Sequence, residues 1–494
     1  MVEFVPKSWW QRNRARVLAA AVALVLVASA GVVVAWWTGR CANGVSRIGD
    51  ECIGVTDGSY AFDDELAEVT RKIKAENDWV LQQPRPHVSI VYLAPMTLTE
   101  GDTITMASTR NGLEGAYLSQ RRANRTAGWH GDSPLIRILL ANPGSQFKQW
   151  EPVTRQIVGM RDSGSEPVVA VAGLGQSHEG TANAITALTR SRMPMVGATV
   201  TADGFTDRID GGRSWMIRVA PPNSAQVRAV VDRLADTRSA MLVQDDNQSD
   251  VFARNLNENF SREYPRDGRE LLQPQIYDSS LDTANSFSTI VTNICVAQPD
   301  AIFFSGRFGD LKDLLAALNA RICGKRNLRV VTLDSLVNIA GIDKIKEQLS
   351  NMRLEYTQLA APKAWDGRDQ YFSTSATNDF RNLLASEFYR QPGDEEAAIM
   401  SYDAVGVAAT AIRRAAENAT QNPAPPVTSD AVFQQFYAMN GASVVPGASG
   451  WISLNERGDP QQKALSFFTL TGNGFAPGSP EVVSDTGLPL DPGL

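Results

Sequence analysis

Polar side chains that could bind a small molecule follow the predicted strands of this chain. Gln176 and Ser177 lie in the loop 173–179, and Thr199 and Thr201 follow the next predicted strand. In open parallel sheets, ligands bind at the carboxyl ends of strands, beside the amino ends of the following helices. The free N–H groups at those helix ends favour carboxylates or phosphates. These residues predict one half of a binding site.

Equivalent positions in the second half of the chain hold charged side chains. They are Arg307, Asp334 and the loop 245–250, which contains Ser249. An arginine can pair an anionic group of a ligand, and an aspartate can pair an amine. Each residue also has a purely structural interpretation, because a Ser or Thr can cap a helix and Arg307 can pair with an aspartate of the same chain.

The motifs of common enzymes are absent from the sequence. There is no G-x-S-x-G nucleophile turn, no phosphate-binding G-x-x-x-x-G-K-[ST] loop and no complete dinucleotide fingerprint. A hydrolase that uses Ser177 and His178 is a weaker hypothesis, because adjacent residues rarely point at each other. The three histidines, His87, His130 and His178, lie far apart and lack partners at metal-ligand spacing. We therefore predict a protein that is not an enzyme and needs no cofactor or metal.

Composition and charge narrow the class of partner. The chain has 494 residues, of which 43% are hydrophobic, so it has ample capacity to form folded domains. Its 47 basic and 54 acidic residues give a net charge of −7. Because nucleic-acid binding depends on clustered cations, a nucleic acid is excluded as the main partner.

The amino terminus predicts a membrane anchor. Residues 17–37 form an uncharged, largely apolar run, preceded by a basic segment over 1–16. A helix of this length matches a bilayer core, and the positive-inside rule leaves the remainder of the chain extracytoplasmic. The localisation expected is thus the cell membrane, with a single pass. A cleaved signal peptide at 28–30 and a lipoprotein modified at Cys41 are the alternatives.

Four cysteines suit an oxidising compartment, and they permit three connectivities. Cys41 and Cys52 flank a Gly49-Asp50 turn, as the ends of a stapled hairpin would. Cys295 and Cys323 each precede a predicted strand, so they are expected at the starting edges of neighbouring strands, close enough to bridge. A zinc site is the alternative, although no C-x-x-C spacing occurs.

Apolar runs of strand length alternate with amphipathic helical stretches along most of the chain. Such alternation is typical of parallel strands covered by helices on both faces. The strands of the first series are predicted over 88–93, 136–140, 168–174 and 195–198, and those of the second over 239–243, 272–277, 301–305 and 328–333. Two such series predict an α/β protein with two doubly wound parallel-sheet lobes, in addition to the amino-terminal transmembrane helix.

Several segments resemble the landmarks of a known family. They are Met193-Pro-Met-Val-Gly-Ala-Thr-Val-Thr201, Ile217-Arg-Val-Ala-Pro221 with Asn223-Ser-Ala-Gln226, Tyr402-Asp-Ala404, and Gly447-Ala-Ser-Gly450 with Gly458-Asp-Pro460. In this order, over about 87–474, the chain resembles the type I periplasmic binding proteins of the leucine- and branched-chain-amino-acid-binding branch. That resemblance implies two lobes joined by three crossovers, with a solute clamped between them by hinge closure.

The resemblance also implies an organisation and a site. The domains expected are a cytoplasmic segment 1–16, an anchor 17–37, a disulfide hairpin with a helical extension 38–85, a first lobe 86–220 plus 358–440, a second lobe 221–357 plus 441–474, and a flexible tail 475–494. The ligand residues expected are Gln176, Ser177, Thr199, Thr201, Ser249, Arg307 and Asp334. The family's aromatic contact falls near Ser249, where this chain has neither Tyr nor Phe, so a polar or anionic solute is as plausible as leucine.

The partners implied are a small polar or amino-acid-like solute and an ABC-type permease or a sensory complex in the membrane. A scaffold of the same fold that binds no solute remains the alternative.

Overall fold

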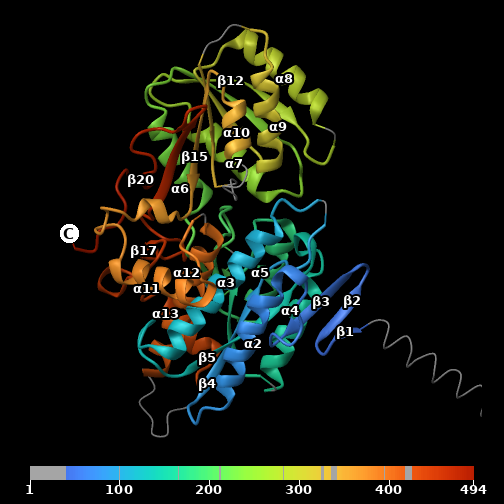
Figure 1. Ribbon diagram of the computed structural model, residues 1–494, viewed down its shortest axis with the longest axis vertical. Coiled ribbons are helices and arrows are strands. Elements are labelled where there is room, and N and C mark those ends of the chain that lie inside the picture. The colour runs from blue at the N-terminus through green and yellow to red at the C-terminus, as the bar shows by residue number, and fades with distance from the viewer. Residues whose placement is uncertain are drawn as a thin grey trace, which may run out of the picture.

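The computed structural model describes residues 40–99, 101–164, 166–207, 209–210, 213–281, 283–323, 327–334, 342–393, 395–417 and 426–493. In these ranges the chain forms two α/β lobes, one above the other in Figure 1. Each lobe is built around an eight-stranded sheet whose central strands are parallel and almost wholly buried. The predicted fold class of two lobes with parallel-dominated sheets is confirmed.

The first sheet has the order β1-β2-β3-β5-β4-β6-β7-β10. Its strands are β1 (Arg40–Ala42), β2 (Val45–Ile48), β3 (Glu51–Thr56), β4 (His87–Leu93), β5 (Leu135–Asn142), β6 (Val168–Gly173), β7 (Met195–Gly197) and β10 (Met216–Arg218). Strands β5, β4, β6, β7 and β10 run parallel, whereas β1, β2 and β3 add an antiparallel edge. The amino-terminal hairpin therefore extends the sheet of the first lobe.

The second sheet has the order β12-β11-β13-β14-β15-β18-β19, with β20 also pairing β18. Its strands are β11 (Ser239–Asp245), β12 (Glu270–Tyr277), β13 (Ala301–Ser305), β14 (Leu328–Thr332), β15 (Met352–Gln358), β18 (Leu465–Thr471), β19 (Gly474–Phe475) and β20 (Glu481–Val483). The first five are parallel, and β18 to β20 pair antiparallel.

Helices cover the faces of both sheets. They are α2 (Ala67–Leu81), α3 (Met106–Arg125), α4 (Trp150–Asp162), α5 (Glu179–Arg190), α6 (Asn223–Arg233), α7 (Val251–Glu263), α8 (Ala284–Ala297), α9 (Phe308–Asn319), α10 (Ile342–Gln348), α11 (Thr374–Phe388), α12 (Glu396–Glu417) and α13 (Ser429–Phe436). Helix α12 is buried nearly all round because it packs against α3 and against strands β6 and β7. Side-chain caps set several helix starts, among them Thr105 before α3 and Asp250 before α7.

The chain passes between the lobes three times. It leaves the first sheet after β10 and enters the second lobe through α6, returns after β15 to reach α11 and α12, and crosses again from the hairpin β16 (Val445–Gly447) and β17 (Gly450–Ile452) to β18. Buried Arg218 holds this crossing region together, because it donates to Asp459 Oδ1 at 2.7 Å and to the carbonyls of Val200 and Ala202.

Two disulfides bridge the four cysteines. Cys41 is bonded to Cys52 across the β1–β3 hairpin, and Cys295 is bonded to Cys323, with separations of 11 and 28 residues. Both predicted pairings are confirmed. The second bridge differs from expectation in its place, because Cys295 lies in the last turn of α8 and not at a strand edge. Cys323 lies after the end of α9 at Asn319, so the bridge joins the last turn of α8 to the segment that follows α9.

Part of the segment 475–494, expected to be a flexible tail, packs against the second lobe. Strand β20 pairs with β18, and Val483 is only 4% exposed. Two adjacent valines in an otherwise polar segment supply enough apolar surface for this short edge strand.

The predicted localisation, a single-pass membrane protein, is corrected. Within the part of the chain that the structure describes, no helix is both long enough and apolar enough to cross a bilayer. The predicted span over 17–37 lies outside the described residues.

Candidate ligand-binding site

A pocket lies between the two lobes and takes its walls from both. Its empty space is about 750 Å³, counting the part that is open to solvent. Polar residues of the first lobe on its wall include Ser108, Thr109, Gln176, Ser177, Thr199 and Thr201, and the second lobe contributes Phe252, Arg307 and Asp334.

Six of the seven residues predicted for the site line this pocket. The exception is Ser249, which is exposed and donates its hydroxyl to Asn247 Oδ1 at 2.7 Å. The aromatic side chain that the sequence lacks at this point is supplied three residues later, where Phe252 on the first turn of α7 reaches the pocket wall.

Ser177 is engaged with the backbone of the first lobe. Its Oγ accepts hydrogen bonds from the amides of Thr201 and Ala202, each at 3.1 Å, and the side chain is almost fully buried. Thr199 donates its hydroxyl to the carbonyl of Gly175 at 2.8 Å. Together these bonds hold the loop after β6 against the loop after β7. The two bonds to Ser177 also use backbone amides that could otherwise bind a carboxylate of a ligand.

Arg307 is neutralised inside the second lobe. Its Nε and Nη2 donate to the two carboxylate oxygens of Asp250 at 2.6 and 2.8 Å, and the guanidinium lies 4.3 Å from the ring centre of Phe252. Burial alone would raise the pKa of Asp250, but the charge and hydrogen bonds of Arg307 outweigh it and lower that pKa. The pocket therefore contains an arginine whose charge is already paired.

Two polar atoms on the pocket wall lack a hydrogen-bond partner among the described residues. They are Thr109 Oγ1 on the first turn of α3 and Asp334 Oδ1 at the end of β14, and both atoms are buried. Burial raises the pKa of Asp334 to about 6, although nearby Arg307 and Gln226 oppose the shift. A buried polar atom without a partner costs roughly 1–3 kcal/mol, so both positions favour a ligand that bonds to them.

Helix α12 completes the wall on the side of the first lobe. Ser401 shares a hydrogen bond of 2.8 Å with the hydroxyl of Tyr92, and Glu396 accepts from the amide of Leu359 at 3.0 Å. Burial raises the pKa of Tyr92 to about 12, so its hydroxyl remains neutral. Glu396 adds a second carboxylate, beside that of Asp334, to the pocket lining.

The hydrolase hypothesis finds no support in this geometry. His178 Nε2 lies 3.3 Å from Gln176 Oε1, while Ser177 is bonded to backbone amides as described. Burial, together with the charge of Arg307, lowers the pKa of His178 to about 4. The described residues therefore do not join Ser177 and His178 as a nucleophile and its base.

The arrangement of two lobes around a pocket agrees with a comparison of protein families. The family model described as periplasmic binding protein matches residues 106–473, about three quarters of the chain. This protein belongs to the periplasmic binding protein family. No curated protein has a significant sequence match to it.

Solved structures of periplasmic binding proteins share the fold at low sequence identity. A leucine-binding protein (LivK) from Thermotoga maritima is 17% identical, with 79% of this chain and 97% of that chain covered and a TM-score of 0.59. A branched-chain amino acid transporter substrate-binding protein (LivJ) from Streptococcus pneumoniae, in complex with isoleucine, is 16% identical over 81% and 99%, with a TM-score of 0.60.

A solute-binding protein of an ABC transporter from Rhodopseudomonas palustris, in complex with 3,4-dihydroxybenzoic acid, is 13% identical over 79% and 95%, with a TM-score of 0.56. Structures of this fold thus hold both amino acids and aromatic acids.

The wall residues that were not predicted from the sequence include four that could contact a ligand, namely Thr109, Phe252, Glu396 and Ser401. All four lie on helices, whereas the prediction considered only loops that follow strands. The signal that could have found two of them is the position of Thr109 and Phe252 in the first turn of a helix that follows such a loop.

Proposed function

We propose that this protein binds a small solute with a positively charged group in the pocket between its lobes. The solute's cationic group pairs with Asp334, and a second polar group bonds to Thr109 on the opposite wall. This proposal narrows the general solute-binding role of the family to a class of ligand.

The observation that carries the proposal is the pair of unpartnered buried atoms, Thr109 Oγ1 and Asp334 Oδ1, one in each lobe. A ligand that bonds to both would hold the lobes together, which is how binding proteins of this architecture close.

The balance of charge in the pocket supports a cation. Arg307 is paired with Asp250, so the pair adds no net charge, whereas Asp334 is a carboxylate with one buried oxygen that lacks a partner among the described residues. The amides of Thr201 and Ala202 are occupied by Ser177, which weakens the case for a carboxylate at that point. A diamine or a basic amino acid fits these charges better than a simple organic anion does.

A partner protein would recognise the form in which the solute is bound and the lobes are closed around it. An ABC-type permease or a sensory complex are the two partners that fit a binding protein of this kind.

A scaffold that binds no solute is the second candidate. The observation that favours it is the internal pairing of Arg307 and of Ser177, both of which would be expected to face a solute.

Titration calorimetry of the full chain tests the proposal, with putrescine, L-lysine, L-leucine and benzoate as the probes. We expect putrescine or L-lysine to bind, and expect Thr109→Val and Asp334→Asn each to weaken that binding at least tenfold. Ser249→Ala is the matched control, because Ser249 is exposed outside the pocket and should leave binding unchanged. Tighter binding of benzoate than of the amines would refute the cationic class, and no binding by any probe would favour the scaffold.

A further inference from the structure

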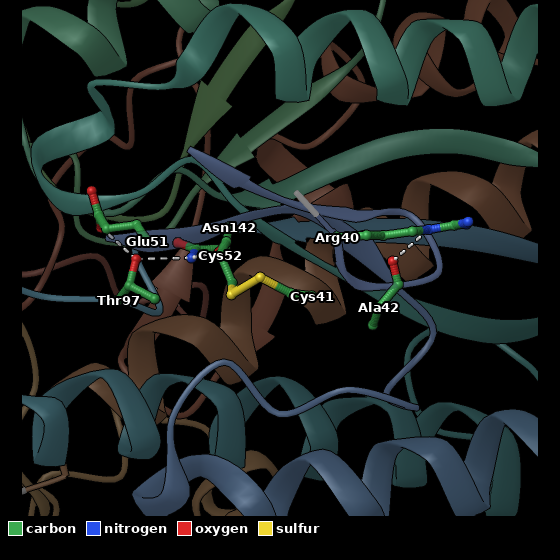
Figure 2. The surroundings of a disulfide bond; sticks show 7 residues. All are labelled: Arg40, Cys41, Ala42, Glu51, Cys52, Thr97 and Asn142. Carbon is green, nitrogen blue, oxygen red and sulfur yellow. Dashed lines mark hydrogen bonds between the residues drawn. A yellow bond between two sulfur atoms is a disulfide. The ribbon is translucent and has the colours of Figure 1, made fainter. Parts of the chain in front are cut away.

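The disulfide-stapled hairpin at the start of the described chain is connected to the ligand pocket by side-chain hydrogen bonds. The hairpin precedes residue 106, where the match to the family begins, and so does Thr97, which it contacts. Figure 2 shows the contact: Thr97 lies between Glu51 and Asn142, with the Cys41–Cys52 bridge beside them.

Glu51, on β3 next to Cys52, is the central acceptor. Its Oε1 accepts from Thr97 Oγ1 at 2.5 Å and from the amide of Ser145 at 2.8 Å. Two loops of the first lobe, after β4 and after β5, are thereby tied to one carboxylate oxygen of the hairpin. Bonds to an ionised acceptor are the stronger class of hydrogen bond, so this carboxylate is suited to hold both loops.

Asn142 makes a second connection at the same place. Its Nδ2 donates to the carbonyl of Cys52 at 2.8 Å and to Thr97 Oγ1 at 3.0 Å, while its Oδ1 accepts from the amide of Met96 at 2.8 Å. Asn142 is completely buried. The backbone at the disulfide and the start of the loop after β4 therefore share one fully buried amide side chain.

The loop after β4 continues from this anchor to the pocket. Asp102 Oδ2 accepts from the amide of Thr99 at 2.7 Å and from Ser145 Oγ at 2.6 Å, and Thr103 donates to Gln176 Oε1 at 2.9 Å. Ile104 lines the pocket. Thr105 then caps α3, whose first turn carries Thr109. Hydrogen bonds and the backbone of residues 101–105 together connect the hairpin to the pocket wall.

We propose that Glu51 is a positioning residue for the pocket: the hairpin, held by Cys41–Cys52, fixes the residues 97–99 and 101–105 at the pocket wall and so sets solute affinity. The effect on affinity rests on the proposed function, whereas the effect on the loop does not. Loss of the disulfide lets the hairpin move, which releases the same loop.

Hydrogen–deuterium exchange of the full chain tests the positioning. In Glu51→Ala and in the double variant Cys41→Ser, Cys52→Ser, we expect peptides that cover 97–105 to exchange about tenfold faster or more, because their anchor is lost. Glu51→Gln keeps an acceptor oxygen and should restore most of the protection. Asp50→Asn is the matched control, because this neighbouring carboxylate is exposed and should leave the exchange unchanged. Peptides over β13 and α9 in the other lobe report whether the variant is folded.

Should Glu51→Ala fail to fold, Thr97→Val decides, because it removes, at nearly constant shape, the hydroxyl that donates to Glu51 and accepts from Asn142. If the variant that folds exchanges over 97–105 at the same rate as the wild-type protein, the proposal is overturned.

Calorimetry with putrescine and L-lysine tests the effect on affinity. We expect Glu51→Ala to lower the affinity for the probe that binds by at least fivefold. Unchanged affinity together with faster exchange would overturn the link between the hairpin and the pocket. If neither probe binds the wild-type protein, the cationic-solute proposal fails by itself, and exchange still decides whether Glu51 positions the loop.

Discussion

Arg307 and Asp250 form a bidentate ion pair inside the second lobe, with Nε–Oδ2 and Nη2–Oδ1 distances of 2.6 and 2.8 Å. Asp250 also accepts from the amides of Phe252 and Ala253, so it caps α7 as well. The pair thus joins the loop after β13 to the start of α7 and balances the charge of an arginine on the pocket wall.

Asp250→Asn separates these two roles. Asparagine caps a helix as well as aspartate does, but it leaves the buried guanidinium without a counter-charge. We expect the free energy of unfolding to fall by about 3–5 kcal/mol, as measured by urea denaturation. Benzoate should gain affinity in calorimetry, because the pocket becomes more positive.

Asp246→Asn is the control for this variant, since Asp246 is exposed on the same loop. If Asp250→Asn has the same free energy of unfolding as the control, the ion pair does not contribute to stability.

The ionisation of Asp334 predicts how solute binding depends on pH. Burial raises its pKa to about 6, so the carboxylate is charged at pH 7 and is protonated as the pH falls through that value. The ammonium group of putrescine stays charged over this range, so we expect its affinity to fall about tenfold between pH 7 and pH 5. His178 does not interfere, because its pKa is lowered to about 4 and it is neutral throughout.

In Asp334→Asn the residual affinity should be the same at both pH values. Calorimetry at each pH measures this, and an affinity that rises on acidification would identify an anionic solute instead.

The disulfide between Cys295 and Cys323 predicts an effect on stability without an effect on binding. It closes a segment of 28 residues, for which the loop-entropy relation gives a stabilisation of about 3–4 kcal/mol. It joins the last turn of α8 to the segment that follows α9, whereas the pocket is lined by Arg307, at the opposite end of α9. We therefore expect Cys295→Ser with Cys323→Ser to lower the free energy of unfolding by that amount and to leave solute affinity unchanged.

A loss of solute affinity in this double variant would contradict the prediction, because it would show that the Cys295–Cys323 bridge influences the pocket. The contrast with the Cys41–Cys52 double variant, which is expected to affect the pocket, makes the two bridges controls for each other.

Much of the fold followed from short-range patterns. The eight apolar runs of the two predicted series all became strands, because a buried parallel strand must be apolar on both faces and so leaves a clear signal. The hairpin of Cys41 and Cys52 was also expected, but its pairing with β5 was not, since nothing in the sequence of β3 specifies which sheet edge it joins.

The site was predictable only where it follows strands. Arg307 and Asp334 were predicted from their places after strands and they line the pocket, but the sequence did not show which aspartate pairs with Arg307, and it is Asp250, 57 residues away. Glu396 and Ser401 reach the pocket because α12 packs beside α3, a contact between residues almost 300 positions apart. Such contacts depend on the whole chain and have no local signature.

The contact of α3 with α12 gives the last prediction, in which two identical substitutions have opposite effects. A Cβ added at Gly115, in the middle of α3, would lie 1.9 Å from the carbonyl oxygen of Ala398 on α12. A Cβ added at Gly159, on the exposed side of α4, would meet no atom within 4 Å.

In a helix, Gly→Ala ordinarily stabilises by about 1 kcal/mol, and we expect this for Gly159→Ala. Gly115→Ala must instead push α12 away, and overpacking of this kind costs about 1–3 kcal/mol. Because α12 carries Glu396 and Ser401, the same movement should weaken solute binding, whereas Gly159→Ala should not. Urea denaturation and calorimetry measure the two effects. Equal stabilisation by both substitutions would show that α3 and α12 accommodate an added methyl group where Gly115 meets Ala398.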